Sequence, residues 1–182
     1  MKKVLIHFAD GFEEIEALTP VDVLRRAGCE VNTVSITGQH NVNSTRGVTV
    51  LTDKLFTESD YEHADLIVLP GGQPGSDNLN RHEGLKRQIV IFNQQGKLLA
   101  AICAAPLVFG STGILKGKNA TCYPGVESRL TGANYTGNEV EVDGNIITGK
   151  GPGLALKFSL LLAEKLVGRE KADEVKKAML VD

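Results

Sequence analysis

A short stretch in the middle of the chain, Lys97-Leu98-Leu99-Ala100-Ala101-Ile102-Cys103-Ala104-Ala105-Pro106, decides its fold. After Lys97 the stretch is apolar as far as Ile102, a length typical of a buried parallel strand. Pro106 suits the first turn of a helix, where its missing N–H costs nothing. We therefore predict that Cys103 lies on a sharp strand-to-helix turn among small residues. That is the geometry of a nucleophile elbow with cysteine in place of serine.

This segment alone leaves two interpretations of Cys103 open. A thiol at the start of a helix faces the positive end of the helix dipole, which favours the thiolate and hence a reactive nucleophile. Most free cysteines are instead small buried hydrophobic residues without a chemical role. The rest of the sequence favours the reactive interpretation.

Size, composition and charge favour one domain over residues 1–182. The chain is 42% hydrophobic, which is enough for a full core. Its net charge of −2 gives no positive excess to neutralise phosphates, so we expect neither nucleic acid nor a membrane as a partner. No apolar segment approaches the ~20 residues that cross a bilayer. The run Val4–Phe8 is too short for a signal peptide, so the expected location is the cytoplasm.

The cysteines and the short motifs argue against a disulfide, a metal or a cofactor. Cys29, Cys103 and Cys122 are odd in number and irregularly spaced, which favours reduced thiols. Neither C-x-x-C nor H-x-x-x-H spacing occurs, so no metal is expected. The glycine-rich signatures of dinucleotide and phosphate loops are also missing from the sequence, so no cofactor is expected.

Apolar strands alternate with helical patterns along the chain, which predicts a mostly parallel sheet with helices on both faces. Strands are predicted at residues 3–8, 30–36, 65–69, 97–102 and 119–122, with short β pieces around Val48–Leu51 and a hairpin of Glu139–Val142 and Ile146–Thr148. Helices are predicted at residues 12–27, 84–95, from 106 onward, near 125–130, and at 153–166 and 171–180. Pro20, after Thr19 as a new N-cap, predicts a kink or break. The segment from Gly71 through Asn80 is predicted to be a loop.

Ligands of such sheets bind beyond the carboxyl ends of the strands. Four segments are predicted to converge there, namely Phe8–Glu16, Pro70–Pro74, Cys103–Pro106 and Tyr123–Gly125. The N–H groups of Gly72 and Ala104 are candidate donors of an oxyanion hole beside Cys103. For Gly71 and Gly72, an ordinary turn after a strand remains the alternative.

Three acidic residues, Glu13, Glu14 and Glu16, crowd the turn after the first strand. At 3.6 residues per turn, Glu13 and Glu16 can share a helix face while Glu14 points elsewhere. A solvated face that complements the helix dipole is the ordinary interpretation. A carboxyl aimed at the sheet edge would instead have a raised pKa, so that it could donate a hydrogen bond to a thiolate or transfer protons.

The positions of the histidines argue against a cysteine–histidine enzyme. All four precede Cys103, namely His7, His40, His63 and His82. A cysteine protease or glutaminase pairs its thiol with an imidazole, and none follows the elbow in this sequence. His7 is predicted to be a core or strand-face residue, and His63 and His82 are predicted to lie at the surface.

Six motifs occur in order along nearly the whole chain. They are Gly11-Phe12-Glu13-Glu14-Ile15-Glu16, Pro20-Val21-Asp22-Val23-Leu24-Arg25-Arg26-Ala27-Gly28, Ser44-Thr45-Arg46-Gly47, Leu69-Pro70-Gly71-Gly72, Ala101-Ile102-Cys103-Ala104-Ala105-Pro106 and Thr148-Gly149-Lys150-Gly151-Pro152-Gly153. Each is weak alone, but their order is specific. The chain resembles the ThiJ/PfpI superfamily, in the DJ-one-like branch that includes bacterial ThiJ and protein deglycase homologues.

This resemblance implies a flavodoxin-like α/β/α sandwich that forms a homodimer. It implies that Cys103 is the reactive cysteine, readily oxidised to sulfinic acid, and that Glu16 is its protonated partner. The residues assigned to the pocket are Gly71, Tyr123, Pro124 and Arg46, and those assigned to the dimer interface or the mouth of the site are Arg25 and Arg26.

The chain departs from its relatives at two positions. Protease-like members carry histidine directly after the cysteine, where this chain has Ala104, so peptidase activity is not expected. Many DJ-one-like members carry histidine where this chain has Tyr123, and a phenol is a poor base at neutral pH. Activity must then depend on Glu16, and we expect it to be weaker than in relatives with the histidine.

Two functions and a third, weaker possibility follow from the resemblance. The first is a glutathione-independent glyoxalase III or protein deglycase, acting on small carbonyl compounds or glycated protein. The second is an oxidative-stress sensor or redox-regulated chaperone in which Cys103 is oxidised, with Cys122 a possible resolving thiol. The third is a family member that keeps the fold without strong activity.

Overall fold

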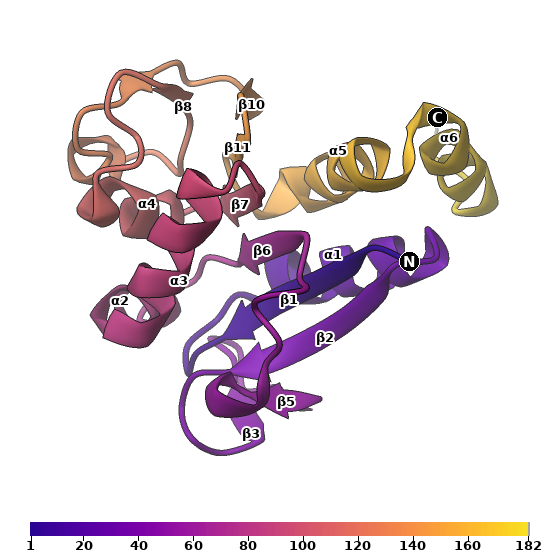
Figure 1. Cartoon of the computed structure of the whole chain (residues 1–182), viewed down its shortest axis with the longest axis horizontal. Helices are drawn as coiled ribbons and strands as arrows, with labels where there is room; N and C mark the ends of the chain where they lie inside the picture. The colour runs from indigo at the N-terminus through magenta and orange to yellow at the C-terminus, as the bar shows by residue number, and fades with distance from the viewer. Residues whose placement is uncertain (182) are drawn as a thin grey trace.

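The computed structural model describes residues 1–181, which form a central sheet covered by helices on both faces (Figure 1). Across the sheet the strands are β10 (Val140–Asp143), β11 (Ile146–Gly149), β7 (Leu98–Ile102), β6 (Leu66–Leu69), β1 (Lys3–Phe8), β2 (Glu30–Ser35) and β5 (Lys54–Leu55). Every neighbouring pair in this sheet is parallel except β10–β11. The predicted mostly parallel α/β fold is therefore confirmed.

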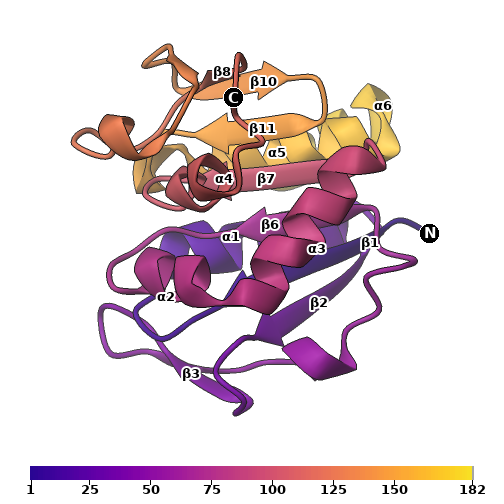
Figure 2. The same ribbon diagram turned by 60° about the vertical axis from the view of Figure 1, so that its left-hand side comes forward.

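The helices divide between the two faces of the sheet. One face carries α1 (Glu14–Arg26), α5 (Ala155–Val167) and α6 (Arg169–Ala178), and the other carries α2 (Gly75–Arg81), α3 (Glu83–Gln94) and α4 (Pro106–Thr112). Figure 2 shows α3 in front of the sheet, with α1 and α5 behind it. The result is a three-layer sandwich with two separate hydrophobic cores.

Strand β1 shows how the sequence fills both cores. Successive side chains of a strand point to opposite faces. Val4, Ile6 and Phe8 accordingly pack with α1 and α5, whereas Leu5 packs with α3 on the other side. Because both faces are covered, the strand is apolar almost throughout, as expected for a parallel strand in the centre of a sheet.

Short elements outside the main sheet complete the fold. They are the hairpin of β3 (Asn41–Asn43) and β4 (Thr49–Leu51), the pair β8 (Asn119–Ala120) and β9 (Asn134–Tyr135), and three 3₁₀ turns at Phe56–Glu58, Glu127–Arg129 and Pro152–Leu154. The predicted hairpin near the C-terminal half is present as β10 and β11. The strand predicted at 119–122 is shorter than expected, and the helical turn near 125–130 is a single 3₁₀ turn.

Two predictions about helices differ from the structure. A kink or a break was predicted at Pro20, and α1 does not break there but continues as one helix, with Pro20 itself buried. The missing N–H at Pro20 leaves the carbonyl of Glu16 without its intrahelical donor. The packing of Val23 and Leu24 into the core keeps the helix intact despite that loss.

The second difference concerns the segment from Gly71 to Asn80, which was predicted as a loop, whereas residues from Gly75 onward belong to α2. Its early residues are poor helix formers, so propensity favours a loop. The helix is held in place by Leu79, which is fully buried, and by Gly75, which packs against the backbone of Gly11. A Cβ at Gly75 would lie 2.6 Å from the carbonyl oxygen of Gly11, so only glycine permits this approach.

Candidate active site

The candidate site lies at the carboxyl edge of the sheet, where the chain leaves β1, β6 and β7. Cys103 stands between β7 and α4 with a φ of 64°, a left-handed conformation that is uncommon for residues other than glycine. Its N–H donates to the carbonyl oxygen of Gly149 at 2.8 Å, and its carbonyl oxygen accepts from the N–H of Tyr123 at 2.8 Å. These two bonds hold a backbone conformation that costs about 1–3 kcal/mol.

Glu16 reaches the same point from the first turn of α1. The Glu13 side chain caps this helix by accepting the N–H of Glu16 at 2.8 Å. The Glu16 carboxyl is fully buried, and its Oε2 accepts the N–H of Gly71 at 2.9 Å. Within residues 1–181, Oε1 has no nitrogen or oxygen partner, and the other group that interacts with this carboxyl is the thiol of Cys103.

The electrostatics of this pair differ from the sequence prediction. Burial raises the pKa of Glu16 to about 7, with a further contribution from the charge of Glu13. Burial also raises the pKa of the Cys103 thiol, and the neighbouring Glu16 raises it further, whereas the N–H groups of Ala104 and Gly72 lower it. The sequence predicted a thiolate favoured by the helix dipole, whereas in the structure burial and Glu16 favour the protonated thiol. The thiol and the carboxyl instead compete for a proton.

The two backbone donors predicted for an oxyanion hole are both at the site. The N–H groups of Gly72 and Ala104 both lower the pKa of the Cys103 thiol. Gly71 leaves room for the whole arrangement, since a Cβ there would lie 2.5 Å from Oε2 of Glu16 and 2.7 Å from Cβ of Cys103. Gly71 and Gly72 are thus more than an ordinary turn after a strand.

The three clustered glutamates make different contacts, and Glu14 points away from the other two, as the spacing predicted. Glu13 caps the helix and Glu16 points to Cys103. Glu14 turns away and binds the β3–β4 hairpin, where its carboxylate accepts from the hydroxyl of Ser44 and from the N–H of Arg46 at 2.8 Å. The side chain of Arg46 is exposed on that hairpin. Among the described residues, Arg46 contacts Glu14 through its backbone N–H.

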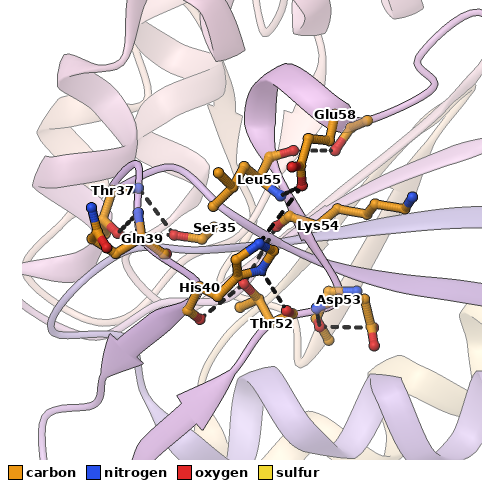
Figure 3. Close-up of polar contacts among 11 residues, drawn as sticks. Ser35, Thr37, Gln39, His40, Thr52, Asp53, Lys54, Leu55 and Glu58 are labelled. Atoms are coloured by element: carbon orange, nitrogen blue, oxygen red, sulfur yellow. Dashed lines mark hydrogen bonds and ion pairs between the residues drawn. The ribbon is translucent and has the colours of Figure 1, made fainter.

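Arg25 and Arg26 lie at the opposite end of α1 from Glu16. Arg25 binds Asp53 at 2.9 Å, and Arg26 binds Asp22 at 2.8 Å. Figure 3 shows Asp53 beside Thr52 and His40 in the polar network that holds residues 52–58 next to β2. Within one chain these two arginines are not part of the site, and their place at a dimer interface stays a prediction.

No histidine is among the groups that act on Cys103 or Glu16 within residues 1–181. His7 is buried as predicted, where its Nε2 lies 2.7 Å from the hydroxyl of Tyr61, and burial lowers its pKa to about 3. His63 is exposed as predicted. His82 is half-buried rather than superficial, because its Nδ1 accepts the N–H of Leu85 and caps α3.

Cys122 precedes Tyr123 in the sequence, but it lies in a different core from Cys103. Cys103 packs in the core on the α1 and α5 side of the sheet, whereas Cys122 packs in the core on the α3 and α4 side. Thiols that point apart cannot form a disulfide without movement of the backbone. Burial raises the pKa of Cys122 to about 11. Both observations disfavour Cys122 as a resolving thiol.

Residues 1–181 lack both a cluster of metal-ligating side chains and a helix that could span a membrane. Residues 1–181 contain no group of three or more histidine, cysteine, aspartate or glutamate side chains arranged to hold a metal ion. None of the helices in the same range is long and apolar enough to cross a membrane.

The raised pKa of Glu16 predicts a pH-dependent stability. The pKa of the folded carboxyl is about 7 and its ordinary value is 4.5, so the folded state keeps a proton that the unfolded chain releases. This contribution is fully present below pH 4.5 and is lost as the pH rises through 7. It amounts to about 3 kcal/mol.

Urea unfolding of the wild type and Glu16→Gln across pH 4.5 to 8 measures this effect. Glutamine keeps an oxygen for the N–H of Gly71 but does not titrate. The stability of the variant relative to the wild type should rise by about 3 kcal/mol as the pH increases. A constant difference between the two proteins would show that Glu16 does not carry a raised pKa.

The known proteins that this chain resembles point to one family. Residues 2–165 match the DJ-1/PfpI family. The chain is 43% identical over 96% of its length to Protein DJ-1 homolog B of Arabidopsis thaliana, of which it spans 40%. It is also 36% identical to Deglycase PYRAB04690 of Pyrococcus abyssi, covering 83% of this chain and 91% of that protein.

The solved structures agree in fold. The structure of oxidised Toxoplasma gondii DJ-1 superposes with a TM-score of 0.94 and 36% sequence identity, covering 100% of this chain and 99% of that chain. That similarity identifies the sheet and its flanking helices as the flavodoxin-like sandwich of this group. The protein belongs to the DJ-1/PfpI family.

Proposed function

We propose that the protein is a reactive-cysteine enzyme that converts α-oxoaldehydes and early glycation adducts, as a glutathione-independent glyoxalase III or protein deglycase does. In this proposal Cys103, on a nucleophile elbow, is the nucleophile and Glu16 transfers protons. The observation that carries the proposal is the buried Glu16 carboxyl, whose Oε1 lacks a nitrogen or oxygen partner within residues 1–181 and which interacts with the Cys103 thiol. The Pyrococcus relative named as a deglycase supports the same class of reaction.

The first chemical step forms a carbon–sulfur bond. The proton of the thiol passes to Glu16, and the sulfur of Cys103 adds to the aldehyde carbon of the substrate. The carbonyl oxygen gains negative charge, which the N–H groups of Gly72 and Ala104 are placed to stabilise. Glu16 returns the proton to that oxygen, which gives a hemithioacetal and leaves Glu16 as a carboxylate.

The second step is an internal oxidation and reduction. Glu16 removes the hydrogen from the former aldehyde carbon as a proton and returns a proton to the neighbouring carbon. The aldehyde carbon is oxidised to a thioester while the adjacent ketone is reduced to an alcohol. Water then cleaves the thioester, which frees the Cys103 thiol and the hydroxy acid. A pKa of Glu16 near 7 lets the same carboxyl accept and donate protons at neutral pH.

The test is the formation of D-lactate from methylglyoxal without glutathione. Cys103→Ser and Glu16→Gln should each lower kcat/KM by about 10²-fold or more, because one lacks the thiol and the other cannot transfer a proton. Glu14→Gln is the matched control, since it changes the same side chain in the same helical turn but faces the hairpin. Wild-type turnover that survives Cys103→Ser would rule out this mechanism.

A second function is favoured by the same geometry. A protonated Glu16 donates a hydrogen bond to an oxidised sulfur as readily as to a thiolate. Redox sensing also needs no histidine at position 123, where this chain has tyrosine. The Toxoplasma gondii relative of this fold was solved in an oxidised form. We propose as the alternative that hydrogen peroxide oxidises Cys103 to sulfenic and then sulfinic acid, releasing one water in each step.

Mass spectrometry after mild peroxide treatment distinguishes this alternative. Two oxygens should be gained at Cys103 but not at Cys29 or Cys122, which are the internal controls because they are buried cysteines that do not interact with Glu16. Glu16→Gln should still allow oxidation but with less sulfinic acid accumulating, since its amide is a weaker donor than a carboxylic acid. Equal oxidation of all three cysteines would eliminate the sensor proposal.

We also propose that the protein is a homodimer joined through α1 and the β3–β4 hairpin. Four large apolar side chains are exposed on these two elements, which Glu14 ties together: Ile15, Leu18, Val48 and Leu51. Exposed apolar patches of this kind mark protein–protein contacts. A second copy of the same chain would cover both elements at once, as an isologous interface requires.

Sedimentation tests the dimer with a matched pair of variants. Ile15 is 55% exposed on α1 and Ile91 is 40% exposed on α3, on the other side of the sheet. Ile15→Glu should shift the protein to the monomer by burying a charge in the contact, whereas Ile91→Glu should leave the dimer intact. A wild-type monomer, or a dimer that both variants preserve, would contradict the proposed interface.

A further inference from the structure

Tyr123 is bound to Cys103 through its backbone, while its side chain is half-exposed. Its side chain is 49% exposed although its backbone N–H is bound to the carbonyl oxygen of Cys103 at 2.8 Å. Its ring packs on Gly151, where a Cβ would lie 3.3 Å from Cδ2 and 3.7 Å from Cε2 of the ring. One face of the ring is therefore supported by backbone next to Cys103, and much of its surface is left uncovered.

The charges around Cys103 are of one sign. Glu16 interacts with the thiol, and the charge of Glu13 acts in turn on Glu16. No lysine or arginine is among the groups that act on Cys103 or Glu16 within residues 1–181. Lys150, next to Gly151 in sequence, directs its Nζ to the carbonyl oxygen of Gly137 at 3.1 Å. An anionic substrate would therefore approach two carboxyl groups, while the ammonium of Lys150 is directed to Gly137.

We propose that Tyr123 forms one wall of the substrate site and that the site prefers uncharged α-oxoaldehydes with an aromatic or large apolar substituent. The inference rests on the proposed function of Cys103 as a nucleophile. A flat substituent stacks on the free face of the Tyr123 ring while the aldehyde carbon lies at the sulfur. Methylglyoxal offers only a methyl group to this wall, and 2-oxo acids bring a carboxylate that the site repels.

The size of the preference follows from the energetics of aromatic contacts. Pairs of aromatic rings stabilise a complex enough to change an equilibrium by about 3- to 10-fold. The preference for phenylglyoxal over methylglyoxal should therefore fall by about that factor when the ring is removed. The phenol hydroxyl has no part in this contact, so phenylalanine should replace tyrosine without loss.

The first experiment measures alkylation of Cys103, which needs no turnover. Phenacyl bromide is the aromatic probe and iodoacetamide is the small neutral probe, and in both the thiolate displaces a halide from a methylene carbon. Tyr123→Ala should lower the ratio of their rates at Cys103 by about 3- to 10-fold, while Tyr123→Phe should preserve it. Tyr135→Ala is the matched control, because Tyr135 is a comparably exposed tyrosine (41%) on β9.

Charge is tested with iodoacetate, the anionic counterpart of iodoacetamide. Iodoacetate should react more slowly at Cys103 than iodoacetamide, by more than the difference seen with a free thiol such as glutathione. Equal relative rates at Cys103 and at the free thiol would contradict the exclusion of anions.

The second experiment compares kcat/KM for phenylglyoxal and methylglyoxal in the same variants. A preference for phenylglyoxal that is lost in Tyr123→Ala and kept in Tyr123→Phe supports the wall. Turnover with an unchanged preference in Tyr123→Ala overturns the wall and leaves the proposed function standing. Alkylation that depends on Tyr123 in a protein without turnover overturns the proposed function and supports the wall.

Discussion

The contact between the buried Glu16 carboxyl and the Cys103 thiol is the constraint on which the site depends. Three separate features bring it about: the Glu13 cap that begins α1, the turn after β6 and the left-handed backbone at Cys103. Gly71 has to lack a side chain because the carboxyl and the cysteine occupy the space beside it. Each feature lies on a different element, so the site forms only when the sheet edge is fully assembled.

This contact also explains why one site supports two functional proposals. A carboxyl with a pKa near 7 donates a proton to whatever develops charge at the sulfur, which is a thiolate, an adduct or an oxidised group. The backbone donors of Gly72 and Ala104 do not titrate, so they stabilise negative charge equally at every pH. What separates catalysis from oxidation is therefore the molecule that reaches the sulfur.

The sequence predicted the layers of the fold and the different direction of Glu14 from that of Glu13 and Glu16, because both follow from periodicity. It missed α2, since propensity disfavours a helix there and the packing of Leu79 and Gly75 overrides it. The prediction that the pKa of the Cys103 thiol is lowered was also wrong. A helix dipole can be predicted from the sequence. Desolvation of the sulfur depends on which segments pack around it, so it is known only from the folded structure.

Tyr123 is one of the two positions where the sequence departs from the pattern of the family it resembles, and the structure shows what surrounds it. An imidazole at position 123 would add a titratable and partly positive group beside the two carboxyls. Tyr123 instead adds a neutral ring supported by Gly151. Proton transfer is then left to Glu16, and the second position becomes free to act in recognition. In our proposal, a tyrosine at this position costs the site an acid–base group and gives it a surface for apolar substrates.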